Sequence, residues 1–417
     1  MRRRSLSQPE LLAPAGGRSQ LEAAVRYGAD AVYLAADRFG MRQRASNFAL
    51  ADIPGAVAFA HAAGVRVYAA LNTLMDADDL AALPAYLEAL AAAGVDAFIV
   101  SDLGALSLAR RHAPGVALHV STQAGVCNAE AARVWHDLGA SRVVCAREMS
   151  VADIARLRAD APRELEIEAF VHGAMCMAVS GRCLLSAAMA DRSGNKGHCA
   201  QPCRWSYALV EEQRPGEFYP IEEDVRGTYV MNARDLCMAE HLDDLAAAGV
   251  SSFKIEGRNK KAFYVATVVH AYRRALDGAE SAEVVAELAC ASHRPYSTGF
   301  YYGRADQSPE RDGYTSTCLH AADVRACEPT GEDAWRVEAV CRNRFCEGDE
   351  LEALAPGRAA FRVLVRDLAW LPAPDAGDPH PAPVPVAVAN RSAEAYAFTV
   401  DEPLEPGDYL RIRRDVP

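Results

Sequence analysis

The chain has 417 residues, with 44 Lys and Arg against 56 Asp and Glu, so its formal net charge at pH 7 is −12. Hydrophobic residues make up 51% and charged residues 24%, which is typical of a soluble globular protein and excludes a disordered or fibrous one. No uncharged run is apolar enough to predict a membrane span. The acidic balance argues against indiscriminate binding of nucleic acid, although a local basic patch would still bind one folded RNA.

The N-terminus carries three arginines after Met1, and no apolar segment follows them, so it does not predict a secretion signal. Twelve cysteines in a long chain without such a signal predict reduced thiols rather than a disulfide framework. We therefore expect a cytoplasmic protein.

From Glu10 to about Asp277, short β-type runs alternate with amphipathic helical segments. Some of these helices end in a glycine suited to a left-handed cap, as at Gly94. Eight strands in regular alternation with helices favour a closed (β/α)₈ barrel over an open sheet. The predicted strands are Glu10–Pro14, Ala29–Leu34, Val65–Leu71, Ala97–Ser101, Ala117–Ser121, Arg142–Ala146, Leu165–Val171 and Ser252–Glu256.

Functional residues of such a barrel lie at the C-terminal ends of its strands. Six polar residues occupy these positions, and their joint placement favours a common site over separate solvated loop residues. They are Asn72, Asp102, Gln123, Glu148, His172 and Glu256.

Three regions follow from the pattern along the chain. The barrel domain is predicted to span residues 1–290, with a cysteine-rich insert at 172–250 between the seventh and eighth strands. Residues 291–325, rich in Tyr, Gly, Pro and Ser, form a predicted linker. Residues 326–417 contain short alternating strands without a helical period, which predicts a small C-terminal β-barrel domain.

Five of the twelve cysteines lie in the insert, namely Cys176, Cys183, Cys199, Cys203 and Cys237. Four thiolates from one loop-rich segment can hold either zinc or an iron–sulfur cluster. Only Cys199 and Cys203 have the short spacing usual in structural zinc sites, so the residues favour a cluster and leave zinc open. The other cysteines are scattered and are expected to be free or core thiols; they are Cys127, Cys145, Cys290, Cys318, Cys327, Cys341 and Cys346.

The local signatures of zinc proteases, serine hydrolases, dinucleotide-binding folds and phosphate loops are absent from the sequence. A serine protease or a metalloprotease is therefore poorly supported by the residues.

The segment EAFVHGAMCMAVSGRCLLS at Glu168–Ser186 closely resembles the signature of the collagenase-like peptidase family of bacterial proteins. The resemblance runs through the predicted barrel and agrees with the C-terminal region only in kind and position. Its further motifs are ELLAPAG at Glu10–Gly16, YGADAVY at Tyr27–Tyr33, NKGHCAQPCR at Asn195–Arg204, MNARDLC at Met231–Cys237 and FKIEGR at Phe253–Arg258.

By length and architecture the chain is most similar to the branch of this family that converts the wobble uridine of tRNA to 5-hydroxyuridine. The resemblance implies oxygen-independent hydroxylation of RNA, with prephenate as the implicated metabolite and an iron–sulfur cluster of the 4Fe–4S type. The implied cluster ligands are Cys176, Cys183, Cys199 and Cys237, and Cys203 could replace Cys199. Other branches hydroxylate ribosomal RNA or ubiquinone precursors, and some relatives work in pairs, so a second family member is a conceivable partner.

A dicarboxylate such as prephenate requires cationic partners, and a guanidinium group binds carboxylate in a bidentate manner. The candidate substrate-binding residues are Arg42, Arg44, Gln123, Lys254 and Arg258. The candidate catalytic residues are Glu148, His172 and Glu256. They would transfer protons near the barrel mouth, and the alternative is that they form salt bridges or hydrogen bonds to the cluster.

A tRNA substrate requires a surface for unpaired bases. An aromatic stretch with two arginines is suited to this role, and packing between domains is the alternative; its residues are Arg294, Tyr296, Phe300, Tyr301, Tyr302 and Arg304. Two competing functions stay open: a peptidase, as the family's name states, and a binding protein whose fold is stabilised by a structural zinc ion.

Overall fold

The computed structural model describes residues 8–41, 47–175, 185–202, 205, 208–209, 219–220, 234–303, 305, 314–331, 333–374 and 381–414. The chain divides into two compact units, each described by itself below. One comprises residues 1–25, 29–265 and 293–315, and the other comprises residues 26–28, 266–292 and 316–417. Residues 266–292, which the sequence analysis assigned mostly to the barrel domain, thus group with the C-terminal strands. Within the described ranges, no helix has the length and apolar character to cross a membrane.

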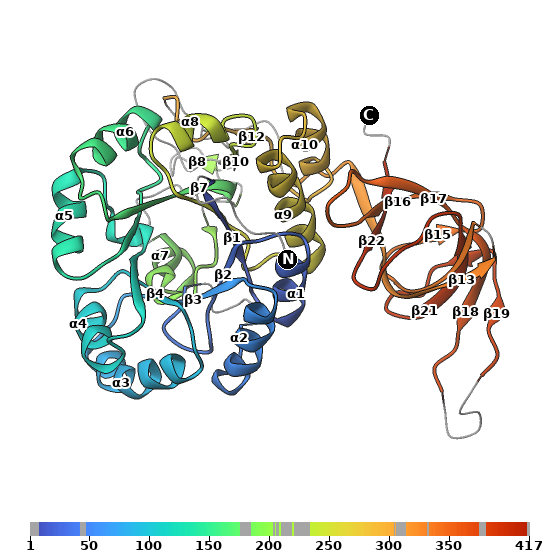
Figure 1. Ribbon diagram of the computed structural model, residues 1–417, viewed down its shortest axis with the longest axis horizontal. Coiled ribbons are helices and arrows are strands. Elements are labelled where there is room, and N and C mark those ends of the chain that lie inside the picture. The colour runs from blue at the N-terminus through green and yellow to red at the C-terminus, as the bar shows by residue number, and fades with distance from the viewer. Residues whose placement is uncertain are drawn as a thin grey trace. The chain divides into compact units, whose positions relative to one another are not determined.

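The first unit is a closed barrel of eight parallel strands, as the sequence predicts (Figure 1). Each strand pairs with the next in order, and β11 closes the ring by pairing with both β7 and β1. Most strands are buried along their whole length, which explains why their apolar runs do not alternate with polar residues. The barrel strands are β1 (Glu10–Pro14), β2 (Ala31–Leu34), β3 (Arg66–Leu71), β4 (Ala97–Val100), β5 (Ala117–Val120), β6 (Arg142–Val144), β7 (Glu166–Ala174) and β11 (Ser252–Ile255).

Helices lie between the barrel strands, and side-chain caps fix where several of them begin. Asp76 and Ser150 each form a capping box at the start of a helix, and Asp102 accepts a hydrogen bond from the Ala105 backbone N–H at 3.0 Å. Gly94 adopts a φ of 84°, which confirms the predicted left-handed cap. The α-helices are α1 (Arg18–Arg26), α2 (Ile53–Ala62), α3 (Ala77–Ala92), α4 (Leu103–His112), α5 (Ala129–Asp137), α6 (Val151–Asp160), α7 (Leu185–Ala190), α8 (Leu242–Ala247), α9 (Ala262–Leu276) and α10 (Ser281–Leu288), and the 3₁₀ turns are η1 (Leu50–Asp52), η2 (Thr122–Ala124) and η3 (Gly194–Lys196).

The sheet extends beyond the ring at the C-terminal end of β7. There β10 (Asp235–Cys237) pairs antiparallel with β7, so that Cys237 lies opposite His172, and β12 (Tyr296–Ser297) pairs with β10. A separate antiparallel pair is formed by β8 (Ala208–Leu209) and β9 (Tyr219–Pro220). β10 and β12 therefore extend the sheet at the C-terminal end of β7.

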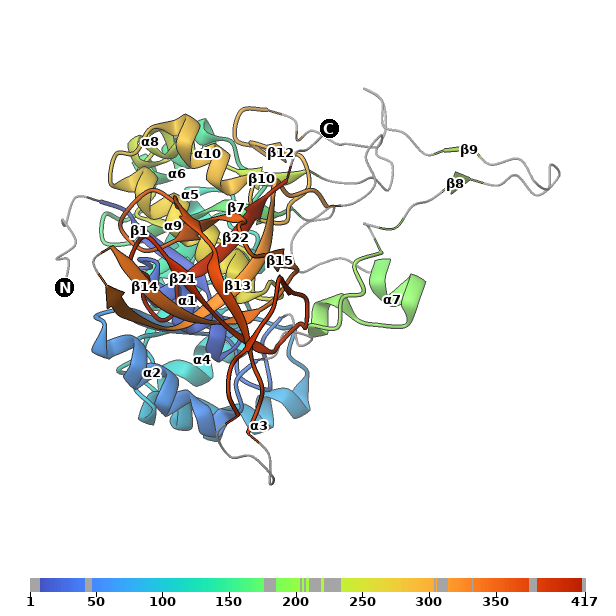
Figure 2. The same ribbon diagram turned by 90° about the vertical axis from the view of Figure 1, so that its right-hand side faces the viewer.

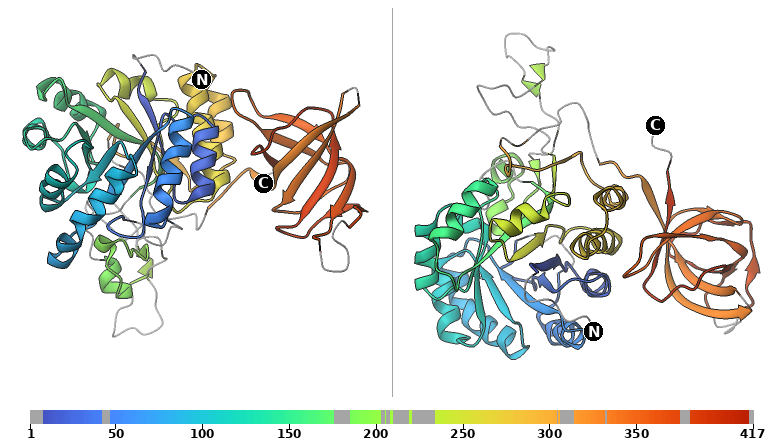
Figure 3. Two further views of the ribbon diagram at one scale, coloured as in Figure 1. Left: turned by 60° about the horizontal axis from the view of Figure 1, so that its bottom comes forward. Right: turned by 45° about the horizontal axis from the view of Figure 1, so that its top comes forward.

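The second unit contains an antiparallel sheet of eight strands in the order β17-β16-β22-β13-β14-β21-β18-β19, in keeping with the predicted all-β region. Figures 2 and 3 show these strands curving around their own interior, which holds a cluster of buried apolar side chains. A shorter pair, β15 with β20, completes it. The strands are β13 (Cys318–Gly331), β14 (Ala334–Cys341), β15 (Phe345–Cys346), β16 (Glu350–Leu354), β17 (Phe361–Leu364), β18 (Arg366–Leu371), β19 (Val384–Pro385), β20 (Val388–Ala389), β21 (Ala395–Val400) and β22 (Tyr409–Arg413).

One cysteine prediction is wrong in this unit. Cys290, after α10, and Cys318, at the start of β13, are joined by a disulfide, whereas both were expected to be free thiols. The backbone N–H of Thr317 donates to Ala289 O at 2.9 Å, which brings these two segments together. Their sequence separation of 28 residues gives no sign of this proximity. Cys127, Cys145, Cys327, Cys341 and Cys346 are not in a disulfide, as predicted.

Candidate functional site

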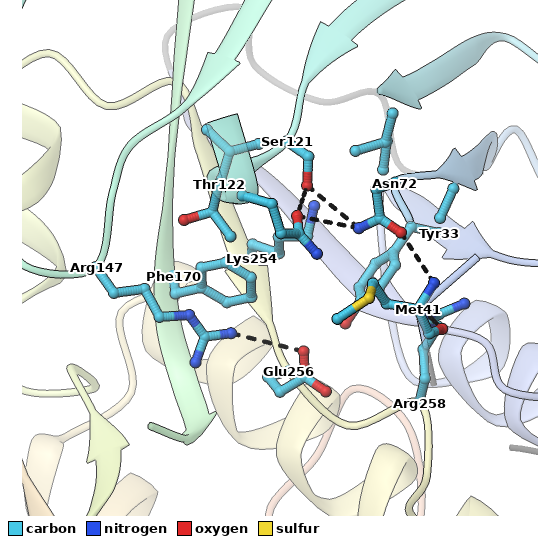
Figure 4. A pocket seen from close by; sticks show the side chains of 14 residues that line it. Tyr33, Met41, Asn72, Ser121, Thr122, Arg147, Phe170, Lys254, Glu256 and Arg258 are labelled. Carbon is cyan, nitrogen blue, oxygen red and sulfur yellow. Dashed lines mark hydrogen bonds and ion pairs between the residues drawn. The ribbon is translucent and has the colours of Figure 1, made fainter. Parts of the chain in front are cut away.

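A pocket opens at the C-terminal ends of the barrel strands (Figure 4). Its lining side chains come from β2, β3, β4, β5, β6, β7 and β11 or from the loops that follow them, as expected for a site in this fold. The apolar part consists of Tyr33, Met41, Ala70, Ile99, Val144 and Phe170, and the polar part of Asn72, Ser121, Thr122, Gln123, Arg147, Lys254, Glu256 and Arg258.

One wall of the pocket is a hydrogen-bonded row of amides and hydroxyls. The Asn72 side-chain amide donates to Ser121 Oγ and to Gln123 Oε1, both at 3.2 Å, and its Oδ1 accepts from the Met41 backbone N–H at 3.1 Å. Ser121 Oγ also donates to Gln123 Oε1. These bonds fix the side chains after β3 and β5 relative to each other, so the wall is preorganised for polar groups of a ligand.

The opposite wall is cationic. The Arg147 guanidinium stacks on Phe170 at 3.8 Å from the ring centroid, and its Nη1 donates to Ala174 O at 2.7 Å. Its Nη2 lies 3.6 Å from Glu256 Oε2, the contact drawn in Figure 4. The Nε of Arg147 is buried and has no hydrogen-bond partner in the described part of the chain. This guanidinium is therefore held by an aromatic face and a carbonyl and keeps donor capacity for an anion.

Lys254 projects into the pocket from the middle of β11 and is nearly fully buried. Its Nζ lies 2.7 Å from Glu168 Oε1 and 4.6 Å from the centre of the Tyr33 ring. Arg258 follows β11, and its Nη2 donates to Met41 O. Among the described lining residues, Arg147, Lys254 and Arg258 stand against one carboxylate, that of Glu256. This arrangement favours a ligand with negative charge.

Beneath the pocket, a buried ionic network fills the barrel. Arg142 Nη1 lies 2.6 Å from Glu10 Oε1 and 2.9 Å from Glu168 Oε2, and Arg66 also pairs with Glu10. Burial alone would raise the pKa of both carboxyl groups, but Lys254 and Arg142 at Glu168, and Arg142 and Arg66 at Glu10, outweigh it and hold both pKa values below the usual range. Both carboxylates therefore stay ionised at neutral pH.

His119 on β5 borders this network and makes stability depend on pH. Burial, with a smaller contribution from Arg142, lowers its pKa well below the usual value, so the folded state keeps the ring neutral. An unfolded histidine binds a proton below about pH 6.5, so stability is lost as pH falls, by at most about 1.4 kcal/mol per pH unit. The variant His119→Phe keeps a ring against Tyr68. We expect its free energy of unfolding, measured by urea denaturation, to fall less between pH 7 and pH 5 than that of the wild type. An unchanged pH dependence would contradict the assignment.

Two glycines allow the loop after β11 to reach the pocket. A Cβ on Gly16 would lie 1.9 Å from Arg258 O, and a Cβ on Gly173 would lie 2.6 Å from Glu256 O. Gly173 also has a φ of 106°, which disfavours any other residue. These close approaches explain why a glycine follows β1 and another lies within β7, and they position the backbone that carries Glu256 and Arg258.

The predicted strand-end residues separate into two groups. Asn72, Gln123 and Glu256 line the pocket, together with the predicted substrate-binding residues Lys254 and Arg258. Asp102 caps α4 instead. Arg42 and Arg44 lie outside the described residues.

Two of the three predicted catalytic residues lie away from the pocket lining. Glu148 is exposed, while the preceding residue, Arg147, lines the pocket. Arg147 was not predicted from the sequence, although it is a cation directly after a predicted strand, and that position was the available signal. His172 is buried in β7, with its ring 5.4 Å from Tyr296. Burial, with smaller contributions from His293 and Lys260, lowers the pKa of His172 to about 3, so the ring is neutral at pH 7.

The predicted cluster ligands are described only in part. Cys176 and Cys183, and also Cys203, lie outside the described residues. Cys199 and Cys237 are half-buried and not in a disulfide, so both sulfurs suit a soft metal centre. Among the side chains that the structure describes, no group of three or more His, Cys, Asp or Glu residues is arranged to hold a metal ion.

Residues 16–311 match the family model described as Peptidase family U32, which covers more than half of the chain. The chain is a member of peptidase family U32. The matched region contains every residue found to line the pocket and the barrel strands from β2 to β11.

Relatives of this U32 protein carry different names. It is 37% identical to "tRNA hydroxylation protein P1" of Bacillus subtilis over 358 residues, which covers 84% of each chain. A 23S rRNA 5-hydroxycytidine synthase of Escherichia coli is 38% identical over 268 residues, covering 64% of this chain and 39% of that protein. "Collagenase" of Porphyromonas gingivalis is 34% identical over 313 residues, covering 71% of this chain and 74% of that protein.

Proposed function

We propose that this U32 protein hydroxylates RNA at a pyrimidine ring, and that its substrate is the wobble uridine of tRNA, converted to 5-hydroxyuridine. The observation that carries the proposal is a match over 84% of both chains to a protein named for tRNA hydroxylation. A second relative is named for 5-hydroxylation of an rRNA cytidine, which supports a pyrimidine as the common target. This function requires access to tRNA and therefore a cytoplasmic location.

The cationic pocket supports a small dicarboxylate, prephenate or a similar metabolite, as the co-substrate. Arg147, Lys254 and Arg258 supply the positive charge, and the amides of Asn72 and Gln123 supply hydrogen bonds to further oxygens. The stacked, partly unsatisfied guanidinium of Arg147 is the donor best fixed for one carboxylate. Glu256 supplies a carboxylate to the lining, and its side chain is 16% exposed. We propose that it accepts a proton in the pocket. Glu148 and His172, which lie away from this lining, are proposed to act from outside the pocket.

An iron–sulfur cluster is the proposed cofactor, with zinc as the alternative occupant of the same sulfurs. Cys176, Cys183, Cys199 and Cys237 would hold it, and the half-buried thiols of Cys199 and Cys237 fit thiolate ligation. Such a cluster supplies electron transfer, which no side chain provides. Pairing with a second family member is a further prediction that follows from the same resemblance.

The test is an analysis of modified nucleosides in a strain that lacks this protein. We expect 5-hydroxyuridine and its derivatives to disappear from total tRNA, measured by liquid chromatography and mass spectrometry, and to return when the wild-type gene is restored. The 23S rRNA of the same strain is the control for hydroxylation of rRNA, because loss of its 5-hydroxycytidine would show that the protein acts on rRNA instead of tRNA. Unchanged nucleosides in both RNAs would refute the proposed function.

A peptidase is the second candidate, favoured by the name of the relative in Porphyromonas gingivalis. The described residues of the pocket lining include no histidine or cysteine. Ser121 contacts the amides of Asn72 and Gln123, neither of which is a general base. Hydrolysis of gelatin by the purified protein, lost in a Ser121→Ala variant, would favour this candidate over RNA hydroxylation.

A further inference from the structure

An exposed tyrosine with two cations over its ring lies outside the pocket. Tyr314 is 44% exposed. Lys260 Nζ lies 4.2 Å and Arg294 Cζ 5.3 Å from the centre of its ring. An exposed ring with a half-buried lysine and a buried arginine beside it has the composition of a stacking platform for an unpaired nucleotide. The ring would contact a base and Lys260 a phosphate, while Arg294, which is 5% exposed, contacts the ring.

This platform, defined by Tyr314, Lys260 and Arg294, adjoins the rim of the pocket. Lys260 is two residues beyond Arg258, in the loop that follows β11, and its backbone N–H donates to Gly257 O at 2.8 Å. Its Nζ also lies 4.9 Å from the centre of the Tyr264 ring, whose hydroxyl donates to Glu256 O at 3.4 Å. One short loop therefore carries both pocket side chains and a cation of the platform.

The aromatic stretch predicted from the sequence is mostly committed to packing. Tyr296 stacks on His293 with ring centres 3.9 Å apart, and the buried Tyr301 donates its hydroxyl to Phe170 O at 2.6 Å. Tyr302 is 52% exposed, but its hydroxyl donates to Asp244 on α8 and its ring contacts His241. In contrast to these tyrosines, Tyr314 is an exposed residue whose ring is contacted by two cations.

Two acidic groups of the described residues near the platform are already engaged. The buried Asp235 accepts a hydrogen bond from the Arg294 backbone N–H at 3.2 Å, and Glu256 faces Arg147 at 3.6 Å. In a chain of net charge −12, long-range attraction of RNA is weak, so contact must rely on local cations of this kind.

We propose that the platform of Tyr314, Lys260 and Arg294 binds an unpaired nucleotide of the RNA substrate next to the pocket. The inference rests on the proposed function and adds to it where a neighbouring base is held. The tyrosine ring stacks on the base with little regard to its identity, while Lys260 contacts a flanking phosphate and the buried Arg294 holds the ring from within the protein. The platform would hold the RNA strand while its target base enters the pocket.

The test measures binding of an anticodon stem-loop RNA by fluorescence anisotropy. Tyr314→Ala is expected to weaken binding about tenfold, because it removes the ring on which the base stacks, whereas Tyr314→Phe retains the ring and the affinity. Tyr302→Ala removes another exposed tyrosine and serves as the matched control, with unchanged binding expected. Lys260→Ala is expected to lower the slope of log affinity against log salt by about one.

A fully paired duplex of the same stem separates stacking from general attraction, because Tyr314→Ala is expected to bind it as the wild type does. Equal stem-loop affinity of wild type and Tyr314→Ala, or an equal loss for Tyr302→Ala, would overturn the platform and leave the proposed function intact. Wild-type protein that binds no stem-loop RNA would overturn both. The thermal melting curve of each variant checks that the protein is folded.

Discussion

Replacing Lys254 by methionine is expected to weaken the binding of prephenate by tenfold or more, and to lower RNA hydroxylation with it. Hydrogen bonds to charged groups contribute about 1.5–3 kcal/mol, which corresponds to roughly ten- to hundredfold in affinity. The substitution removes one of the three cations of the lining and leaves Arg147 and Arg258 opposite Glu256. Calorimetric titration of the purified variant with prephenate measures this loss.

The ionic network supplies the reason to expect a folded variant. Glu168 loses Lys254 but keeps Arg142 Nη1 at 2.9 Å, so no buried carboxylate is left unpaired. Methionine is also close in length to lysine and packs against Tyr33 and Phe170, the two rings near the Lys254 ammonium.

Arg66→Met is the matched control, because Arg66 pairs with Glu10 in the same network and does not line the pocket. Prephenate binding in this variant is expected to equal that of the wild type. Equal losses of prephenate affinity in the two variants would show that the ionic network affects binding only by stabilising the fold. An unchanged affinity in Lys254→Met would exclude Lys254 from the anion site.

The barrel was predictable because its signal is local and repeated. Each strand is a short apolar run, each helix has its own period, and the alternation of the two types sets the topology. The same rule places functional residues at strand ends, and it led to Asn72, Gln123 and Glu256 in the pocket. What it does not give is the direction of each side chain in an irregular loop, so Glu148 was chosen and the adjacent Arg147 was missed.

The floor of the site had a signal that the sequence analysis did not use. Glu10, Arg142 and Glu168 are charged residues within otherwise apolar strands, and charges buried in a barrel must pair with one another. Pairing partners far apart in the chain are set by the register of the closed ring, which composition does not reveal. The disulfide between Cys290 and Cys318 and the exposure of Tyr314 depend in the same way on long-range packing.

Substituting Cys176, Cys183 or Cys237 by alanine is expected to remove most of the iron and sulfide from protein purified without air. The proposed cluster would lose one of its four thiolate ligands in each case, and the brown colour should fade with the metal content. Cys237 ends β10, which pairs with the C-terminal part of β7, and the chain reaches Cys176 two residues after β7 ends. Cys237 therefore lies beside the strand whose last residue precedes Cys176 by two positions in the sequence.

Two further variants decide the fourth ligand. Cys199→Ala is expected to lose iron, while Cys203→Ala retains it; the reverse result would assign Cys203 instead. Cys346→Ala, which removes a half-buried thiol of β15 in the second unit, is the matched control and should keep its full iron content. Full iron occupancy in the Cys176→Ala and Cys183→Ala proteins would refute the cluster, and a colourless wild type with one equivalent of zinc would establish the alternative metal. Because the strands of the closed ring contain none of the substituted cysteines, circular dichroism of every variant should match that of the wild type.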